Sequence, residues 1–149
     1  MISVQQETLF QIADEVDELL QLHYEELTLY KERVALDPIW SRYNEMESAG
    51  SFYVFTVRDD GKLVGYSAFF LVPHMHYAAM RMAHNDVIFL RKDYRDAHTG
   101  KRLIELCESR MKELGADRIT WHVKLSLDWS PLLHRMGYAS EEVVVGKML

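Results

Sequence analysis

Apolar residues recur at helical spacing in the first part of the chain. Between Glu7 and about Tyr30 they lie three or four positions apart, with acidic residues between them. This spacing predicts an amphipathic helix. A second helix is predicted from Pro38 to about Ser48, because Asp37 and Pro38 make a favourable N-cap and first helical residue.

The pattern then changes to one that is typical of strands. Residues 51–57 and 62–72 are rich in β-branched and aromatic side chains. The Arg-Asp-Asp-Gly sequence between them is a strong hairpin signal. Residues 80–91 predict a third long strand.

Helical periodicity returns from Thr99 to Leu114, and Gly115 is expected to end this helix. Residues 117–123 predict a fourth strand. A strand–helix–strand unit favours parallel pairing through a right-handed crossover, so this strand is expected to lie parallel to residues 80–91.

Two short elements complete the pattern, a helix at 131–136 ended by Gly137 and a closing strand at 141–149. The order predicts a single α/β domain in which helices cover a mixed sheet. The chain of 149 residues is long enough for this fold, because a chain of such size buries roughly two thirds of its unfolded surface.

Composition narrows the classes of function. The net charge of −6 argues against a broad nucleic-acid interface. The single cysteine, Cys107, excludes a disulfide framework and fits a reducing compartment. No apolar run approaches the ~20 residues that span a bilayer, and the first residues do not resemble a signal peptide. We therefore expect a cytoplasmic protein that binds neither nucleic acid nor membranes.

The clearest candidate for chemistry is the stretch YRDAHTGKRLIE at residues 94–105. A P-loop needs glycine five residues before its Gly-Lys pair and Ser or Thr after it, but these positions hold Arg95 and Arg102. A helix start still attracts phosphate through its unpaired amides. Gly100 would let the backbone approach such a ligand, and Arg95, Lys101 and Arg102 supply positive charge. A solvated helix start without a ligand is the alternative.

The stretch resembles the pyrophosphate loop of the GNAT superfamily of acyl-CoA-dependent N-acyltransferases, Arg/Gln-x-x-Gly-x-Gly/Ala. Here it runs from Arg95 to Gly100, with His98 in place of the first glycine. The preceding LRKDYR is similar to the family's strand end, and Gly137-Tyr138 matches its Gly-Phe ending. The order of elements also matches along nearly the whole chain, with an uncertain first strand at residues 1–6.

The resemblance implies a mixed sheet with helices on both faces and a splayed parallel strand pair that holds acetyl-CoA as co-substrate. The backbone of Phe89, Leu90 and Arg91 would pair with the pantetheine arm. The pyrophosphate would lie in the loop, whose implied binding residues are Arg95, Asp96, Ala97, His98, Thr99, Gly100 and Lys101. An acceptor amine would attack the thioester directly, with a backbone N–H near Leu90 available for the oxyanion.

Three residues are candidates for the base that takes the amine's proton. Strict alternation places residues 84, 86, 88 and 90 on one face of their strand. His84 occupies a position where some members of the family have a catalytic glutamate, and Asp86 lies nearer the loop on the same face. His122, on the neighbouring strand, is the third. A purely structural role is the alternative for Asp86 and for His122.

Other polar residues point less clearly to chemistry. The tyrosine that commonly reprotonates the thiolate in this family is replaced by Leu133, with His134 beside it. Tyr138 and Cys107 are expected to pack in the core. His74 and His76 could form half of a metal site, but no acidic or cysteine partner is close in sequence, so a loop role is favoured.

The acceptor stays open, as a small-molecule amine or a protein lysine or N-terminus. The acidic first helix could attract a basic substrate, whereas exposed aromatic residues would suit an aromatic amine. The closing strand, 141–149, could pair between chains in a homodimer. Two alternatives remain: a non-catalytic acyl-CoA-binding module, and an interaction domain that uses Trp40, Tyr43 and Trp129.

Overall fold

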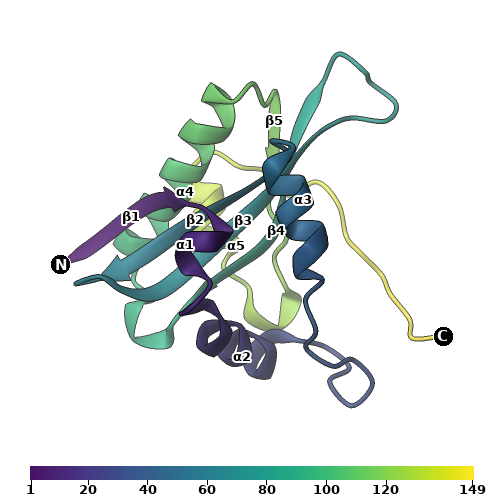
Figure 1. The fold of residues 1–149 in the computed structure, drawn as a ribbon. Helices are drawn as coiled ribbons and strands as arrows, with labels where there is room; N and C mark the ends of the chain where they lie inside the picture. The colour runs from purple at the N-terminus through teal and green to yellow at the C-terminus, as the bar shows by residue number, and fades with distance from the viewer.

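The chain forms a five-stranded sheet with helices on both faces (Figure 1), in a computed structural model that describes residues 1–149. The elements in chain order are β1 (Ile2–Glu7), α1 (Leu9–Ile12), α2 (Val16–Leu27), α3 (Trp40–Ser48), β2 (Phe52–Asp59), β3 (Lys62–Pro73), β4 (Arg81–Leu90), η1 (Lys92–Tyr94), α4 (Ala97–Glu113), β5 (Arg118–Thr120), η2 (Leu125–Leu127) and α5 (Ser130–Arg135). No helix is long and apolar enough to cross a membrane.

The strands lie in the order β1-β2-β3-β4-β5. The first four pair antiparallel, and β4 and β5 pair parallel, as the strand–helix–strand pattern predicted. Residues 2–7, uncertain from the sequence, are an edge strand. The predicted hairpin between β2 and β3 is confirmed, with positive φ at Asp60 (44°) and Gly61 (88°), the conformation that tight hairpin turns favour.

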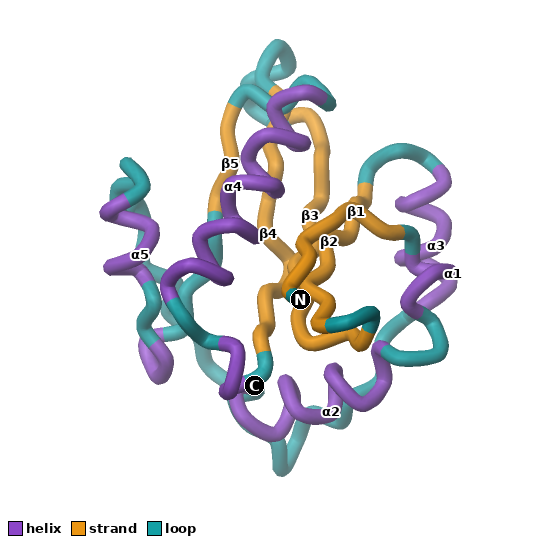
Figure 2. Tube along the Cα trace, turned by 90° about the vertical axis from the view of Figure 1, so that its left-hand side faces the viewer, coloured by secondary structure: helices purple, strands orange, loops and turns teal.

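The sheet has two differently built faces (Figure 2). We call them the α1–α3 face and the α4 face, after the helices that cover them. The core of the α1–α3 face is Leu9, Ile12, Val16, Leu19, Phe52, Val54, Leu63, Tyr66, Ala68 and Phe89. The core of the α4 face is Phe55, Val57, Val64, Phe69, Leu71, Ala83, Leu103, Cys107 and Met111. The predicted core position of Cys107 is thus confirmed.

The parallel strands β4 and β5 separate soon after they meet. They pair only from Met82–Arg118 to His84–Thr120, and β4 then continues to Leu90 without a neighbour on that side. We call this opening the fork. The predicted fourth strand, 117–123, is too long, because residues after Thr120 have lost the partner that a ladder requires.

A β-bulge in β4 changes which residues share a face. Val87 pairs with Ala68 and Asn85 pairs with Phe69, so Asp86 is an extra residue without a partner on β3. The buried Asn85 amide closes the bulge by donating hydrogen bonds to the carbonyls of Ala68 (3.1 Å) and Val87 (2.9 Å).

The predicted alternation is therefore wrong beyond the bulge. His84 and Asp86 do share the α1–α3 face, but the extra residue shifts the parity of the strand. Phe89 joins them there, whereas Ile88 and Leu90 pack on the α4 face.

The first predicted helix is divided in two and is shorter than expected. Glu7 belongs to β1, a turn separates α1 from α2, and α2 ends at Leu27. The cause is Arg58 on β2, whose guanidinium binds the carboxylates of both Glu7 (2.8 Å) and Glu15 (2.8 Å). A straight helix cannot bring both carboxylates to one guanidinium, so the chain turns between them.

Other boundaries also differ from the prediction. The helix α3 begins at Trp40 after an Ile39 N-cap, so Asp37 does not cap it. The helix α4 begins at Ala97, two residues early, because Asp96 is its N-cap.

The predicted closing strand, 141–149, is wrong: this segment forms no ladder and runs away from the sheet (Figure 1). Three consecutive valines favour a strand, but a strand also needs a neighbouring strand to bond to, and this segment lies against none.

Candidate functional site

The apex of the fork is marked by a contact between the two parallel strands. His84 Nδ1 on β4 lies 3.0 Å from Thr120 Oγ1 on β5, at hydrogen-bond distance. Burial and the nearby charges of His122 and His74 lower the pKa of His84. The imidazole is therefore neutral near pH 7 and bridges the last paired residues of the fork.

Asp86 lies beside this apex, on the bulge, and faces the helices. The Tyr43 hydroxyl of α3 donates a hydrogen bond to Asp86 Oδ2 at 2.9 Å. Burial raises the pKa of Asp86, although the bond from Tyr43 and the charge of His122 oppose the change. Burial, followed by the charge of Asp86, raises the pKa of Tyr43 to about 12, so its hydroxyl keeps its proton. The carboxylate is thus held in a defined position with an affinity for protons above that of an ordinary aspartate.

The three predicted bases come together at the fork. His84 and Asp86 lie on the same face of β4, and His122, which is exposed just beyond β5, is close enough for its charge to affect both of their pKa values. His74 also contributes to the surroundings of His84, from the loop between β3 and β4 where it was predicted to lie.

Aromatic side chains lead from the surface to Asp86. Tyr43 stacks on Phe70, with ring centroids 6.3 Å apart, and Trp40 lies 6.2 Å from Tyr43 on the same helix. Trp40 is 37% exposed. The sequence suggested Trp40 and Tyr43 as exposed aromatics for a partner, but the structure turns Tyr43 inward to hold the carboxylate.

His23 on α2 was not identified from the sequence. Its ring stacks on Phe89 at 5.0 Å, and its Nδ1 lies 2.6 Å from the Tyr66 hydroxyl. Burial, followed by the charge of Lys124, lowers its pKa to about 4. Its two contact partners, Phe89 and Tyr66, are more than 40 positions away along the chain, so no local pattern could have indicated these contacts.

Of the three residues predicted to pair with the pantetheine arm, only Leu90 directs its backbone groups toward the fork. The Arg91 amide donates to the Val64 carbonyl (2.9 Å) on β3. Because neighbouring residues of a strand direct their backbone groups to opposite sides, Leu90 directs its N–H and C=O toward the fork, while Phe89 and Arg91 bond toward β3.

The start of α4 is arranged differently from the predicted phosphate cradle. The Asp96 carboxylate caps the helix, accepting hydrogen bonds from the Thr99 amide (2.7 Å) and hydroxyl (2.9 Å). These bonds lower the pKa of Asp96. The Gly100 amide already donates to the Asp96 carbonyl (3.2 Å). The amides that precede the first intrahelical bond are those of Ala97 and His98.

Gly100 permits close helix packing. A Cβ atom at this position would lie 3.2 Å from Leu132 of α5. The exposed His98 lies two residues earlier, and Lys101 forms an ion pair with Glu105 (3.5 Å). The glycine therefore brings α4 and α5 together, whatever else it does.

Arg95, the central cation of the predicted loop, is bound to α2. Its guanidinium pairs with the Glu26 carboxylate, with Nη2 2.8 Å from Oε2, and its Nε donates to the Leu90 carbonyl (2.6 Å). Its Cζ also lies 5.3 Å from the centre of the Phe89 ring. Arg91 pairs in the same way with Glu18 (2.8 Å).

These ion pairs give several acidic residues of the first predicted helix a structural role. Glu15, Glu18 and Glu26 each bind an arginine of the sheet or of the loop after it. Much of the acidic charge is therefore balanced within the chain and holds α2 to the fork.

Neither α5 nor the residues that follow it supply an acid at the fork. Leu133, in the position of the usual tyrosine, is buried, and the exposed His134 lies 2.9 Å from Ser140 Oγ. Tyr138 is half-buried, not part of either core, and its hydroxyl donates to Glu108 (2.6 Å). The predicted core position of Tyr138 is therefore wrong, because this bond draws its hydroxyl to the surface of α4.

Comparison with known proteins gives a consistent result. The sequence profile described as "Acetyltransferase (GNAT) family" matches residues 14–138. A comparison with curated protein sequences finds no match.

Several solved structures share the whole fold. The ribosomal-protein-alanine N-acetyltransferase from Brucella melitensis biovar Abortus 2308 superposes with a TM-score of 0.74 at 18% identity, covering 99% of this chain and 98% of that one. The glucosamine-6-phosphate N-acetyltransferase from Arabidopsis thaliana gives 0.75 at 12% identity, covering 99% and 98%. A predicted acetyltransferase from Clostridium acetobutylicum, solved with acetyl-CoA, gives 0.75 at 12% identity, covering 99% and 96%.

Proposed function

Because the chain belongs to the acetyltransferase (GNAT) family and is an N-acetyltransferase that uses acetyl-CoA, we propose that it acetylates a primary amine at the fork, with Asp86 as the base. The observation that carries this proposal is the position of Asp86. It is a half-buried carboxylate on a bulge beside the fork, held by Tyr43, with a raised pKa.

In this proposal the chain's own residues move one proton. Acetyl-CoA supplies an activated acetyl thioester. The acceptor nitrogen forms a bond to the acetyl carbon, the carbon–sulfur bond breaks, and the nitrogen's proton passes to Asp86, directly or through water. The bond from Tyr43 keeps the carboxylate oriented while it accepts the proton. His84 and His122 would then be supporting groups that adjust the local charge.

The fit of acetyl-CoA rests on backbone groups and one arginine. The N–H of Leu90 faces the fork beside its C=O, which accepts the bond from Arg95, and the amides of Ala97 and His98 begin α4 at its end. Both features favour an extended arm followed by a phosphate. To bind phosphate, Arg95 would have to release the Glu26 carboxylate. A guanidinium can bind either anion, because carboxylate and phosphate oxygens accept its hydrogen bonds with similar geometry.

The acceptor that we propose is an amine with an aromatic or apolar body. Four of the seven acidic residues that might attract a polycation, Glu7, Glu15, Glu18 and Glu26, are already paired with arginines. Aromatic rings, by contrast, line the route from Trp40 to Asp86. A small molecule or a protein N-terminus could both present such an amine, and we place the reaction in the cytoplasm, where a buried thiol such as Cys107 remains reduced.

The test begins with calorimetric titration of acetyl-CoA, followed by a panel of amines and peptides with acetyl transfer read by mass spectrometry. In Asp86→Asn we expect unchanged acetyl-CoA binding and a loss in kcat of about 10²- to 10⁴-fold, the usual contribution of a general base. Asp14→Asn, at an exposed position in the turn between α1 and α2, is the matched control and should retain full activity.

The pH profile separates a base from a structural carboxylate. Because the bond from Tyr43 lowers the pKa of Asp86, Tyr43→Phe should move the acidic limb of kcat/KM to higher pH, and Asp86→Asn should remove that limb. An unchanged limb in both variants would assign the base elsewhere. Acetyl-CoA binding without transfer to any acceptor would instead favour a non-catalytic module.

A further inference from the structure

A buried amide lies next to the bulge of β4, on the α4 face of the sheet. Asn85 is 1% exposed, and Ser67 on β3 is fully buried. The Asn85 Nδ2 group donates to the carbonyls of Ala68 (3.1 Å) and Val87 (2.9 Å). It also donates to Ser67 Oγ (3.1 Å), and the Ser67 hydroxyl in turn donates to the Val87 carbonyl (3.2 Å). Two side chains therefore hold the backbone where the strand ladder is irregular.

The chemistry of this position requires a donor. Three acceptor oxygens surround the Asn85 amide, so its nitrogen and not its oxygen points toward them. An apolar side chain of similar size would cost less to bury, but it would leave the Ala68 carbonyl without this donor and the Val87 carbonyl with only the Ser67 hydroxyl. The amide in this core is therefore matched to the bulge that it closes.

The bulge determines what β4 presents on its other face. Asp86 is the extra residue, free of β3, and its carboxylate accepts the bond from the Tyr43 hydroxyl (2.9 Å). Beyond it, the shifted parity places Phe89 on the α1–α3 face and directs the backbone groups of Leu90 toward the fork. Without the bulge the pairing would shift by one residue, and Leu90 would bond toward β3. A contact on one face of the sheet thus sets the geometry of the other.

We propose that Asn85 is a positioning residue for acetyl transfer. By closing the bulge from the α4 face, its amide fixes the place of Asp86 beside the apex of the fork. Ser67 supports it, because its hydroxyl accepts from Asn85 and donates to Val87. This inference rests on the proposed role of Asp86 as the base. Both supporting residues are buried in the core, so they act through the backbone of β4 and not by touching a ligand.

The first experiment compares two truncations in the same core. Asn85→Ala removes all three bonds of the amide, and Leu103→Ala truncates an apolar side chain that is also 1% exposed. Both variants should lose stability, so kcat is measured per folded molecule, at saturating acetyl-CoA and well below each thermal transition. Asn85→Ala should lose about 10²-fold in kcat, the usual cost of displacing a catalytic group by about 1 Å. Leu103→Ala should stay near the wild type. A wild-type kcat in Asn85→Ala would overturn the proposal.

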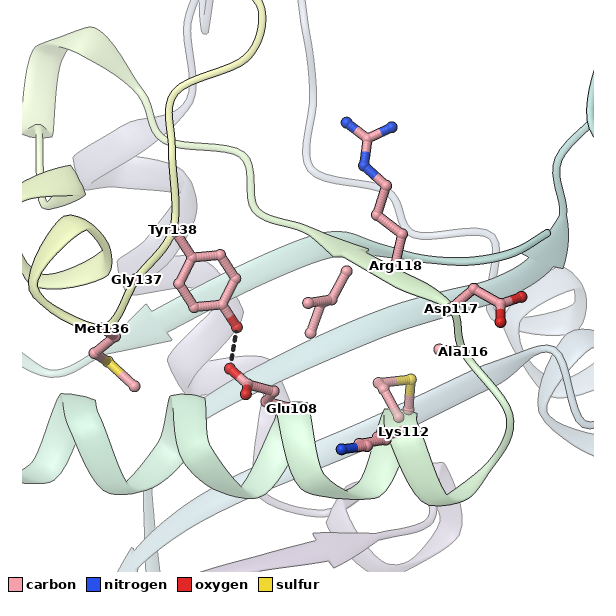
Figure 3. A pocket seen from close by; sticks show the side chains of 10 residues that line it. Glu108, Lys112, Ala116, Asp117, Arg118, Met136, Gly137 and Tyr138 are labelled. Carbon is pink, nitrogen blue, oxygen red and sulfur yellow. Dashed lines mark hydrogen bonds between the residues drawn. The ribbon is translucent and has the colours of Figure 1, made fainter.

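Two further variants control for the loss of a hydrogen bond and for misfolding. Tyr138→Phe removes a bond away from the bulge, the one to Glu108 on α4 (2.6 Å, Figure 3), and should keep the kcat of the wild type. Ser67→Ala is the milder change at the bulge, because it leaves both bonds from Asn85 to the backbone carbonyls. Its kcat should fall by roughly three- to tenfold. If Asn85→Ala does not fold, Ser67→Ala decides the question, and an unchanged kcat in that variant contradicts the proposal.

A double variant shows whether Asn85 acts through Asp86. Asn85→Ala combined with Asp86→Asn should have the kcat of Asp86→Asn alone, because no base is left to displace. A further loss as large as that of Asn85→Ala alone would mean that the two residues act independently, and the positioning role would be wrong. The two proposals fail in different ways. An Asp86→Asn chain with full kcat refutes the base itself and with it this role of Asn85, whereas an active Asn85→Ala beside an inactive Asp86→Asn refutes the positioning role alone.

Discussion

The two faces of the sheet have nearly the same number of core residues but different chemistry. The α4 face is mainly aliphatic and aromatic, and its fully buried polar side chains, Ser67 and Asn85, bond to each other and to the backbone of the strands. The α1–α3 face contains the polar groups of Tyr66, His23 and Asp86 among its apolar residues. One face therefore bonds its buried polar groups internally, and the other places titratable side chains beside the fork, where we propose that catalysis occurs.

The largest expected effect tests whether the α4 face is purely structural. Leu103→Ala removes a side chain that is 1% exposed and should lower the free energy of unfolding by about 2–5 kcal/mol. Activity per folded molecule should stay near that of the wild type. Chemical denaturation measures the first quantity, and kcat at a temperature well below the transition measures the second.

Leu19→Ala is the matched variant on the other face, where Leu19 is 2% exposed. Its stability loss should be similar, but it loosens α2 beside the fork and should also reduce kcat. An equal loss of kcat in both variants would show that the two faces do not differ in function as we propose.

The second effect concerns the buried imidazole of the α1–α3 face. Burial, followed by the charge of Lys124, holds the pKa of His23 at about 4, below the 6.5 expected in the unfolded chain. The unfolded state therefore binds a proton first as the pH falls, and the native state loses stability between pH 6.5 and 4. From the two pKa values this loss is on the order of 3 kcal/mol. His23→Gln should flatten that part of the stability profile.

Denaturation measured at a series of pH values provides this profile. His98→Gln, at an exposed position of α4, is the control and should leave the slope unchanged. If both variants follow the wild type, His23 is accessible to solvent protons in the native state and the α1–α3 face is less well sealed than its contacts indicate.

The smallest expected effect concerns the ion pair between Arg95 and Glu26 at the outer end of the fork. Glu26→Gln removes the anion that holds Arg95. Because such pairs contribute up to about 1 kcal/mol, acetyl-CoA affinity should rise by roughly two- to fivefold as the arginine becomes available to phosphate. Glu25→Gln, at the exposed neighbouring position, should bind like the wild type in the same calorimetric titration. A loss of affinity in Glu26→Gln would mean that the pair positions the loop instead of competing with the ligand.

Much of the fold followed from local pattern. Apolar spacing and turn residues predicted the hairpin at Asp60-Gly61, the three long strands, the helix α4 and the parallel pairing of β4 with β5. These features depend on residues that are close together in the chain, and a single sequence contains that information.

The features that failed depend on distant partners. The break between α1 and α2 results from Arg58, which collects Glu7 and Glu15 from more than 40 positions away. The missing closing strand reflects the lack of a neighbour for 141–149, which no property of the valines themselves could reveal.

For the site, the sequence and the family resemblance supplied candidate residues but not the relations between them. His84, Asp86 and His122 were recognised as candidates and do lie together. Strict alternation could not anticipate the bulge, since its formation depends on how the Asn85 amide meets the backbone of β3. The partner of Arg95 was equally invisible, because Glu26 lies 69 residues earlier in the chain.

The contact between His84 and Thr120 has a mechanical consequence. It joins the last paired residues of two strands that diverge beyond it, and β4 stays paired with β3 as far as Leu90, so the residues after Thr120 are the arm that is free to move. Residues 121–123 extend this arm about 10 Å from the contact at the usual rise of a strand. A rotation of about 10° at the contact then moves the end of the arm by roughly 2 Å. One imidazole–hydroxyl contact at the vertex therefore limits how far the fork can open.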